Sequence, residues 1–232
     1  MEPLSGSLRK RYDLPKLVKQ LTAAGAPAIS VNNDGVLFGG VVEDITKARE
    51  AADAAAAEGV AAPPVLASDL LLYPYQLYKL RLAGADAVTL VVGALEGKDL
   101  AYLTKIASTV QLQVVASVTS EVQLSRLTAL GAGSIAALVV SNRDLATFGF
   151  DESGEQALTL LRSAALRSFR EKHNDVPVLV EGRVGIVTSS NDGDGVEYVR
   201  ALKEAGAFGA IVGGGMAIMN DDDAAKSMDS WA

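Results

Sequence analysis

Four polar side chains that could do chemistry each follow closely on a short apolar run: Asp69, Asn142, Arg143 and Glu181. A carboxylate at such a place can give or take a proton when its surroundings move its pKa towards neutrality. Asp69 and Glu181 could together hold magnesium beside a phosphate, but one pair of carboxylates is weak evidence for a metal site. We therefore expect no metal and no cofactor.

The same residues are also consistent with purely structural roles. Asp69 would then form an ion pair with an arginine, while Asn142 and Arg143 would brace the loop that contains them. No predicted strand end carries a lysine, which argues against a Schiff-base aldolase.

Composition excludes several classes of protein. The 232 residues include no cysteine and one histidine, so thiolate nucleophiles, disulfides and multi-histidine zinc sites are ruled out within this chain. Lysine plus arginine (21) against aspartate plus glutamate (28) gives a net charge of −7, and the scattered basic residues argue against a nucleic-acid partner. No apolar run approaches the roughly 20 residues of a membrane span. A single domain over residues 1–232 is expected.

Short apolar runs alternate with amphipathic stretches, a pattern typical of repeated βα units. The predicted strands cover 28–31, 64–67, 87–92, 113–118, 135–140, 176–180 and 207–212. The predicted helices cover 13–24, 43–58, 75–83, 120–130 and 196–205, and each is followed by a glycine that can close it. Seven strands fit either an open doubly wound sheet or a (β/α)8 barrel that lacks one strand.

Specific strings decide between these folds. In chain order they are AISV at 28–31 with FGG at 38–40 and ED at 43–44, PVL at 64–66 with Asp69, PYQ at 74–76, AGADAV at 83–88, NRDL at 142–145 with Phe148 and Asp151, EG at 181–182 and VG at 212–213. This ordered set resembles the indole-3-glycerol-phosphate synthases, (β/α)8 enzymes that close the indole ring in tryptophan biosynthesis. The resemblance implies an α/β fold of the TIM-barrel class.

The resemblance also identifies which strand is missing. The family opens with a strand carrying Glu-Ile-Lys-Arg, followed by Ser-Pro-Ser-Lys-Gly, and residues 2–6 (EPLSG) are similar to the end of that motif. We therefore expect a barrel whose first strand is absent from this chain.

The family's acid/base positions are altered here. By the resemblance, Ser68 stands where the family has a lysine that acts as general acid, Ser117 replaces a catalytic glutamate, and Ser141 replaces an asparagine. Glu181 keeps the glutamate of the family's Glu-Ser-Gly, whereas its serine is Gly182. A serine hydroxyl does not exchange protons near neutral pH without a neighbouring base.

The family's phosphate site is built mainly from backbone N–H groups, so it can survive such changes. The corresponding residues here are Gly182, Arg183, Gly213, Gly214 and Gly215. Glycine lets an anion approach the backbone closely, and the arginine fork suits phosphate. The family's own pattern is not kept, and a turn without a ligand is the alternative interpretation.

Two functions remain. The first interpretation is a catalytically degenerate barrel, a pseudoenzyme that serves as a phosphate-ligand-binding, structural or regulatory subunit. The alternative is an active carbon–carbon lyase of tryptophan biosynthesis, or a related enzyme on a phosphorylated sugar-like substrate, using Glu181 or Asp69. The expected partners are a phosphorylated small molecule and a protein complex. The resemblance implies a cytoplasmic or plastid stromal location.

Overall fold

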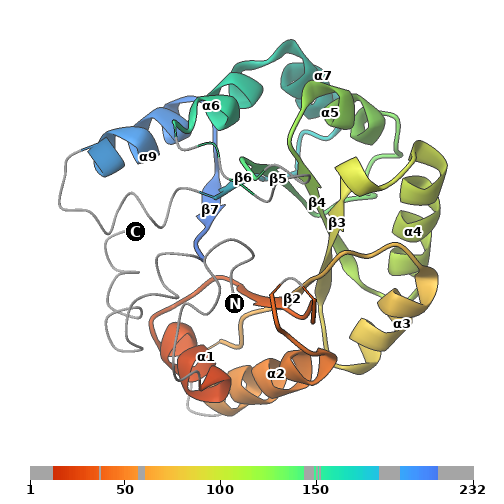
Figure 1. The fold of residues 1–232 in the computed structure, drawn as a ribbon, viewed down its shortest axis with the longest axis vertical. Helices are drawn as coiled ribbons and strands as arrows, with labels where there is room; N and C mark the ends of the chain where they lie inside the picture. The colour runs from red at the N-terminus through yellow and green to blue at the C-terminus, as the bar shows by residue number, and fades with distance from the viewer. Residues whose placement is uncertain are drawn as a thin grey trace. The chain divides into compact units, whose positions relative to one another are not determined.

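Parallel strands and helices alternate along the chain in the computed structural model, which describes residues 13–36, 38–56, 61–143, 149, 151, 153–182 and 194–213 (Figure 1). The strands are β1 (Ile29–Asn32), β2 (Val65–Ser68), β3 (Ala87–Val91), β4 (Gln113–Val118), β5 (Ala137–Ser141), β6 (Val178–Glu181) and β7 (Gly209–Ile211). Their order in the sheet is β1-β2-β3-β4-β5-β6-β7, as in the (β/α)8 class. The expected fold class is confirmed, and the doubly wound alternative, whose strand order is not sequential, is wrong.

The helices confirm most of the sequence pattern. They are α1 (Leu14–Ala23), α2 (Val42–Ala56), α3 (Pro74–Leu82), α4 (Gly97–Thr109), α5 (Glu121–Thr128), α6 (Glu155–Arg162), α7 (Ala164–Lys172) and α9 (Asp194–Glu204), with a 3-10 turn η1 (Val92–Ala94). The pattern had not indicated α4, α6 and α7. Gly84 and Gly206 close α3 and α9 with φ of 99° and 90°, a left-handed conformation that glycine adopts without strain.

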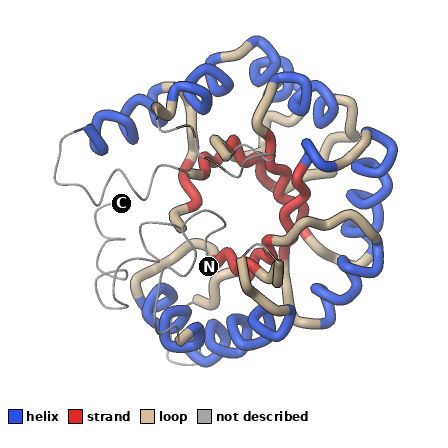
Figure 2. Tube along the Cα trace, viewed as in Figure 1, coloured by secondary structure: helices blue, strands red, loops and turns tan. Residues whose placement is uncertain are grey.

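The described residues fall into two compact units. The first contains residues up to Thr89 together with Val110–Leu112. Its strands β1 and β2 are parallel, with Ile29 opposite Val65, and β2 pairs with the start of β3. Helices α1, α2 and α3 cover one side of these strands (Figure 2). Val18 of α1 and Ile45 of α2 are almost fully buried, as the apolar faces of these helices require.

The second unit contains Leu90–Thr109 and the described residues from Gln113 onwards. Strands β4 to β7 are parallel throughout. Every residue of β5 is buried, which is expected for a parallel strand covered on both faces. Phe169 of α7 is fully buried against this side of the unit.

Strand register brings polar strand ends together within each unit. Asn32 lies opposite Ser68 in the first unit, and Ser141 lies opposite Glu181 in the second. Parallel strands end at the same edge of a sheet, which is where enzymes of this class place their reactive groups. The polar side chains found by sequence pattern are therefore positioned by the carboxyl ends of β1 and β2, and of β5 and β6.

Candidate functional site

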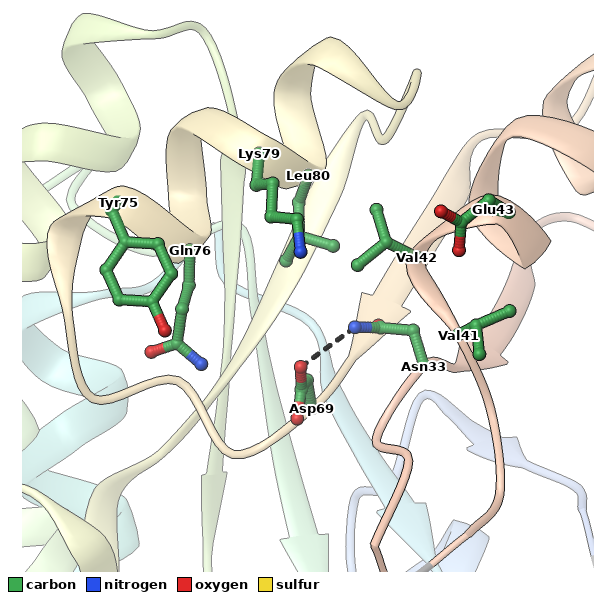
Figure 3. Close-up of a pocket in the computed structure, with 9 residues that line it drawn as sticks. All are labelled: Asn33, Val41, Val42, Glu43, Asp69, Tyr75, Gln76, Lys79 and Leu80. Carbon is green, nitrogen blue, oxygen red and sulfur yellow. Dashed lines mark hydrogen bonds between the residues drawn. The ribbon is translucent and has the colours of Figure 1, made fainter.

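An asparagine–aspartate pair joins the ends of β1 and β2 in the first unit. The Asn33 Nδ2 donates a hydrogen bond to Asp69 Oδ2 at 2.9 Å (Figure 3). The backbone N–H of Leu70 donates to Asp69 Oδ1 at 2.7 Å. Asn33 is 4% exposed and Asp69 is half-buried. Each carboxylate oxygen of Asp69 thus accepts one hydrogen bond, from an amide and from a backbone N–H, and the predicted ion pair with an arginine is not what the described residues show.

Burial raises the pKa of Asp69, because removing the carboxylate from water disfavours its charged form. The hydrogen bond from Leu70 opposes this shift, the negative charge of Asp34 adds to it, and the Asn33 hydrogen bond and Lys79 charge oppose it more weakly. Asp69 therefore holds its proton to a higher pH than an ordinary aspartic acid.

Gln76 fixes the loop between β2 and α3 that carries Asp69. Its Oε1 accepts hydrogen bonds from the backbone N–H groups of Leu72 and Tyr73 at 2.8 and 2.9 Å, and its Nε2 donates to the Leu70 carbonyl at 3.1 Å. Pro74 begins α3 at the position where a missing N–H costs nothing. The loop is held by one side chain from the helix that follows it.

A second cluster surrounds Glu181 at the end of β6. The Ser141 side chain forms a hydrogen bond with the Glu181 carboxylate, and the Arg143 charge acts on the same group. The backbone N–H of Arg143 donates to Ser141 Oγ at 3.3 Å, so this hydroxyl is oriented. Burial is the largest effect and raises the pKa of Glu181, while Arg143 and Ser141 lower it. The side chain keeps some exposed surface although its carboxyl group is enclosed by protein.

Asn142 is hydrogen-bonded to Asp151 beyond the end of β5. Its Nδ2 donates to the Asp151 carbonyl at 3.2 Å, and the Asp151 N–H donates to the Asn142 carbonyl at 3.0 Å. These two hydrogen bonds are of the kind that the bracing role requires. Asn142 is 1% exposed, and its Oδ1 lies so close to Gly182 that a Cβ at 182 would be 1.6 Å from it.

Gly182 also has a φ of 123°. Both the close approach of Asn142 and this left-handed backbone exclude a side chain at 182. Position 182 of this structure therefore accommodates glycine, because the buried amide of Asn142 occupies the place where a side chain would begin.

The other predicted site residues lie in one or other of the two units or outside the described residues. Ser68 is half-buried at the end of β2 in the first unit, and Ser117 of β4 is 8% exposed in the second. Gly213 is exposed after β7, and a Cβ there would meet nothing within 4 Å. The predicted phosphate ligands Arg183, Gly214 and Gly215 lie outside the described residues.

The described part of the chain contains no group of three or more acidic or histidine side chains able to hold a metal ion. It also contains no helix long and apolar enough to cross a membrane.

Sequence reasoning missed Asn33, Gln76 and Lys79. Asn33 had a detectable signal, because it follows an apolar run as Asp69 does. Gln76 and Lys79 lie on a helix, where their spacing gives no sign of the loop and cavity that they contact.

Known proteins match the whole length of the described fold. The family model for indole-3-glycerol phosphate synthase matches residues 1–230. The indole-3-glycerol phosphate synthase of Rippkaea orientalis is 28% identical over 211 residues, covering 91% of this chain and 64% of that protein. This chain thus spans somewhat less than two thirds of that relative.

Solved structures agree on the fold. A 3-hexulose-6-phosphate synthase superposes with a TM-score of 0.64 at 21% identity, covering 94% of this chain and 92% of that one. Orotidine 5'-phosphate decarboxylase from Pyrococcus horikoshii superposes with a TM-score of 0.61 at 15% identity, covering 96% and 95%. At these identities the structures support the barrel fold alone. The match of the family model over nearly the entire chain shows that this protein belongs to the indole-3-glycerol phosphate synthase family.

Proposed function

We propose that this chain is the barrel of an enzyme that closes the indole ring on a phosphorylated substrate, with Glu181 as its acid/base group. Family membership supports the reaction class, since the relatives are indole-3-glycerol phosphate synthases. The observation that carries the proposal is the cluster of Ser141, Arg143 and Glu181 at the end of parallel strands. This places the active interpretation ahead of the degenerate one.

The cluster has the chemistry that dehydration during ring closure requires. Glu181 keeps its proton to a higher pH than an ordinary glutamic acid, so it can donate that proton to a leaving hydroxyl, which departs as water. The Arg143 charge then favours the carboxylate that remains. The Ser141 hydroxyl, itself held by the Arg143 N–H, keeps the carboxyl group in one orientation.

The serines limit the expected rate. Ser68 and Ser117 stand where the family has a lysine and a glutamate, and neither hydroxyl titrates near neutral pH. Loss of one acid/base group typically lowers the rate about 10²- to 10⁴-fold, and losses within one site do not add simply. We therefore expect turnover that is slow but dependent on Glu181.

Phosphate recognition is the second part of the proposal. Gly182 and Gly213 follow β6 and β7, and the open space at Gly213 is compatible with an anion close to the backbone. Arg183, Gly214 and Gly215 complete the proposed phosphate site on the evidence of the sequence alone.

The second candidate function is a barrel without catalysis that acts as a binding, structural or regulatory subunit. The observation that favours it is the presence of serine at 68, 117 and 141, three positions where the family has amide or titrating side chains.

Two assays on the purified protein separate these functions. Indole fluorescence follows product formation from the synthase substrate, and calorimetric titration measures binding of the same substrate. We expect product with the unaltered protein, and a rate at least about 10²-fold lower for Glu181→Gln with binding retained. Glu121→Gln, on the exposed start of α5, is the matched control and should leave the rate unchanged. Binding without product in the unaltered protein would establish the non-catalytic function instead.

A further inference from the structure

A cavity of about 330 Å³ lies within the first unit, beside the asparagine–aspartate pair (Figure 3). It is bounded by the loop after β1, the start of α2, the end of β2 and one face of α3. Its lining residues are Asn33, Val41, Val42, Glu43, Asp69, Tyr75, Gln76, Lys79 and Leu80. The volume is in the range of small-molecule sites in proteins. None of the roles proposed above for Glu181 uses this cavity.

One wall of the cavity accepts hydrogen bonds. Asp69 must accept, so the NH2 group of Asn33 faces it and the Asn33 Oδ1 is directed elsewhere. Asn33 is buried, with 4% of its surface exposed, and this oxygen has no hydrogen-bond partner. That oxygen has almost no accessible surface, so the acceptors open to a ligand in the cavity are the carboxylates. Asp69 and Glu43 add two carboxylates to the lining.

The facing wall donates and carries positive charge. Lys79 projects from α3 into the cavity (Figure 3). Its charge acts on Asp69, although no ion pair between the two is among the salt bridges of the described residues. Helix α2 begins at Val42 on the cavity wall, but Glu43 and Asp44 in its first turn offset the positive end of its dipole, so the positive charge of the lining comes from Lys79.

An apolar surface lies between the two polar walls. Val41, Val42 and Leu80 contribute aliphatic groups to it. Tyr75 contributes its aromatic ring (Figure 3). The cavity therefore combines a group of acceptors, a separate cation and an apolar surface.

We propose that this cavity binds a free α-amino acid with an apolar side chain. The ammonium group would donate to Asp69, and the carboxylate would pair with Lys79. The side chain would pack on Val41 and Val42, which are the accessible aliphatic groups of the lining. A phosphate ester fits less well, because the carboxylates of Asp69 and Glu43 would repel its negative group.

Calorimetric titration of the full chain with L-phenylalanine and L-leucine tests the proposal. We compare L-phenylalanine with phenethylamine, which lacks the carboxylate, and with N-acetyl-L-phenylalanine, which lacks the ammonium charge. Each analogue should bind at least roughly tenfold more weakly, because charge-assisted hydrogen bonds contribute about 1.5–3 kcal/mol and 1.4 kcal/mol is tenfold.

Two variants locate the site. Lys79→Gln should weaken L-phenylalanine binding by at least roughly tenfold. Lys105→Gln on α4, also an exposed lysine, should leave binding unchanged. Because Lys79 is exposed, its variant is expected to fold, and thermal unfolding verifies this.

The proposal is overturned by any of three results. These are no binding of either amino acid at millimolar concentration, equal binding of L-phenylalanine and both analogues, or binding that Lys79→Gln does not alter. Inorganic phosphate that competes with N-acetyl-L-phenylalanine but not with phenethylamine would identify a simple anion site instead. All readouts are binding constants, so failure here is distinguishable from failure of the proposed activity.

Discussion

Two regions each hold a carboxyl group at the carboxyl ends of neighbouring strands, but they surround it differently. The first region is the ends of β1 and β2, and the second is the ends of β5 and β6. Each region contains a carboxyl group whose pKa burial raises, Asp69 in one and Glu181 in the other. Each also contains a buried asparagine with an unpartnered Oδ1, Asn33 and Asn142 respectively. The difference lies in where the asparagine directs its NH2 group.

Asn33 donates to the carboxylate itself, whereas Asn142 donates to a loop carbonyl. Asp69 is thereby held as an acceptor in a polar cavity. Among the described residues, the Ser141 hydroxyl and the Arg143 charge act on Glu181 against its burial. The comparison suggests that the first region is built to bind and the second to exchange protons.

The largest effect is expected from restoring the family's serine in the second region. Gly182→Ser combines a left-handed backbone with a Cβ 1.6 Å from Asn142 Oδ1, and we expect it to lower the free energy of unfolding by about 2–5 kcal/mol. Urea unfolding measures this. Adding Asn142→Ala should recover part of the loss by removing the clash. A Gly182→Ser protein with an unchanged midpoint would contradict the account of this contact.

The next prediction concerns pH. A carboxyl group with a raised folded-state pKa contributes stability that is complete below its unfolded pKa and is lost as the pH rises through its folded pKa. The unaltered protein should therefore lose stability over this interval relative to Glu181→Gln. Asp69→Asn should show a smaller difference, since Asn33 and Leu70 stabilise the Asp69 carboxylate. Thermal unfolding of the three proteins from acidic to neutral pH tests the order, and the reverse order would refute the comparison.

The hydrogen bond from Asn33 to Asp69 can be removed by substituting Asn33 alone. Asn33→Ala should destabilise the protein by about 1–3 kcal/mol and raise the pKa of Asp69 further, because the lost hydrogen bond favoured the charged form. Carboxyl ¹³C NMR titration follows the pKa. Asn32→Ala, at the exposed neighbouring asparagine, is the matched control. If both variants shifted the Asp69 titration equally, the specific bond would not be its cause.

The smallest effects should come from the glutamines that hold the two sets of loops. Gln76 makes three hydrogen bonds to the loop after β2, whereas Gln123 makes two to Thr119 after β4. Gln76→Ala should cost about 1–2 kcal/mol and Gln123→Ala about 0.5–1 kcal/mol. Urea unfolding of both variants compares them directly, and equal losses would show that these bonds do not set loop stability.

Apolar runs predicted the strands well, because parallel strands buried on both faces are apolar along their length, whereas the order of the strands was predicted from the family resemblance. Glycines 84 and 206 marked helix ends correctly. Glycine 131 did not, because α5 ends at Thr128 and the positive φ nearby belongs to Gly133. Ser120 caps the start of α5 by accepting a hydrogen bond from the Gln123 N–H, while the Gln123 side chain accepts one from the Thr119 N–H.

The site was predicted less completely, for a physical reason. Glu181 and Asp69 were found because they end apolar runs. Lys79 was not found, because the sequence pattern of a helix does not distinguish a lysine that faces a cavity from one that faces solvent. The glycine at 182 was recognised only as a departure from the family. The close approach of Gly182 to the amide of Asn142 is a contact between two strand ends that no spacing in the chain reveals.

The central claim is that Glu181 acts as a proton donor, and its pH–rate profile tests this most directly. The single-turnover rate of indole formation should fall in the unaltered protein as pH rises through the raised pKa of Glu181, and Glu181→Gln should be slower with no such dependence. Identical profiles for the two proteins, or substrate binding with no product at any pH, would contradict the claim.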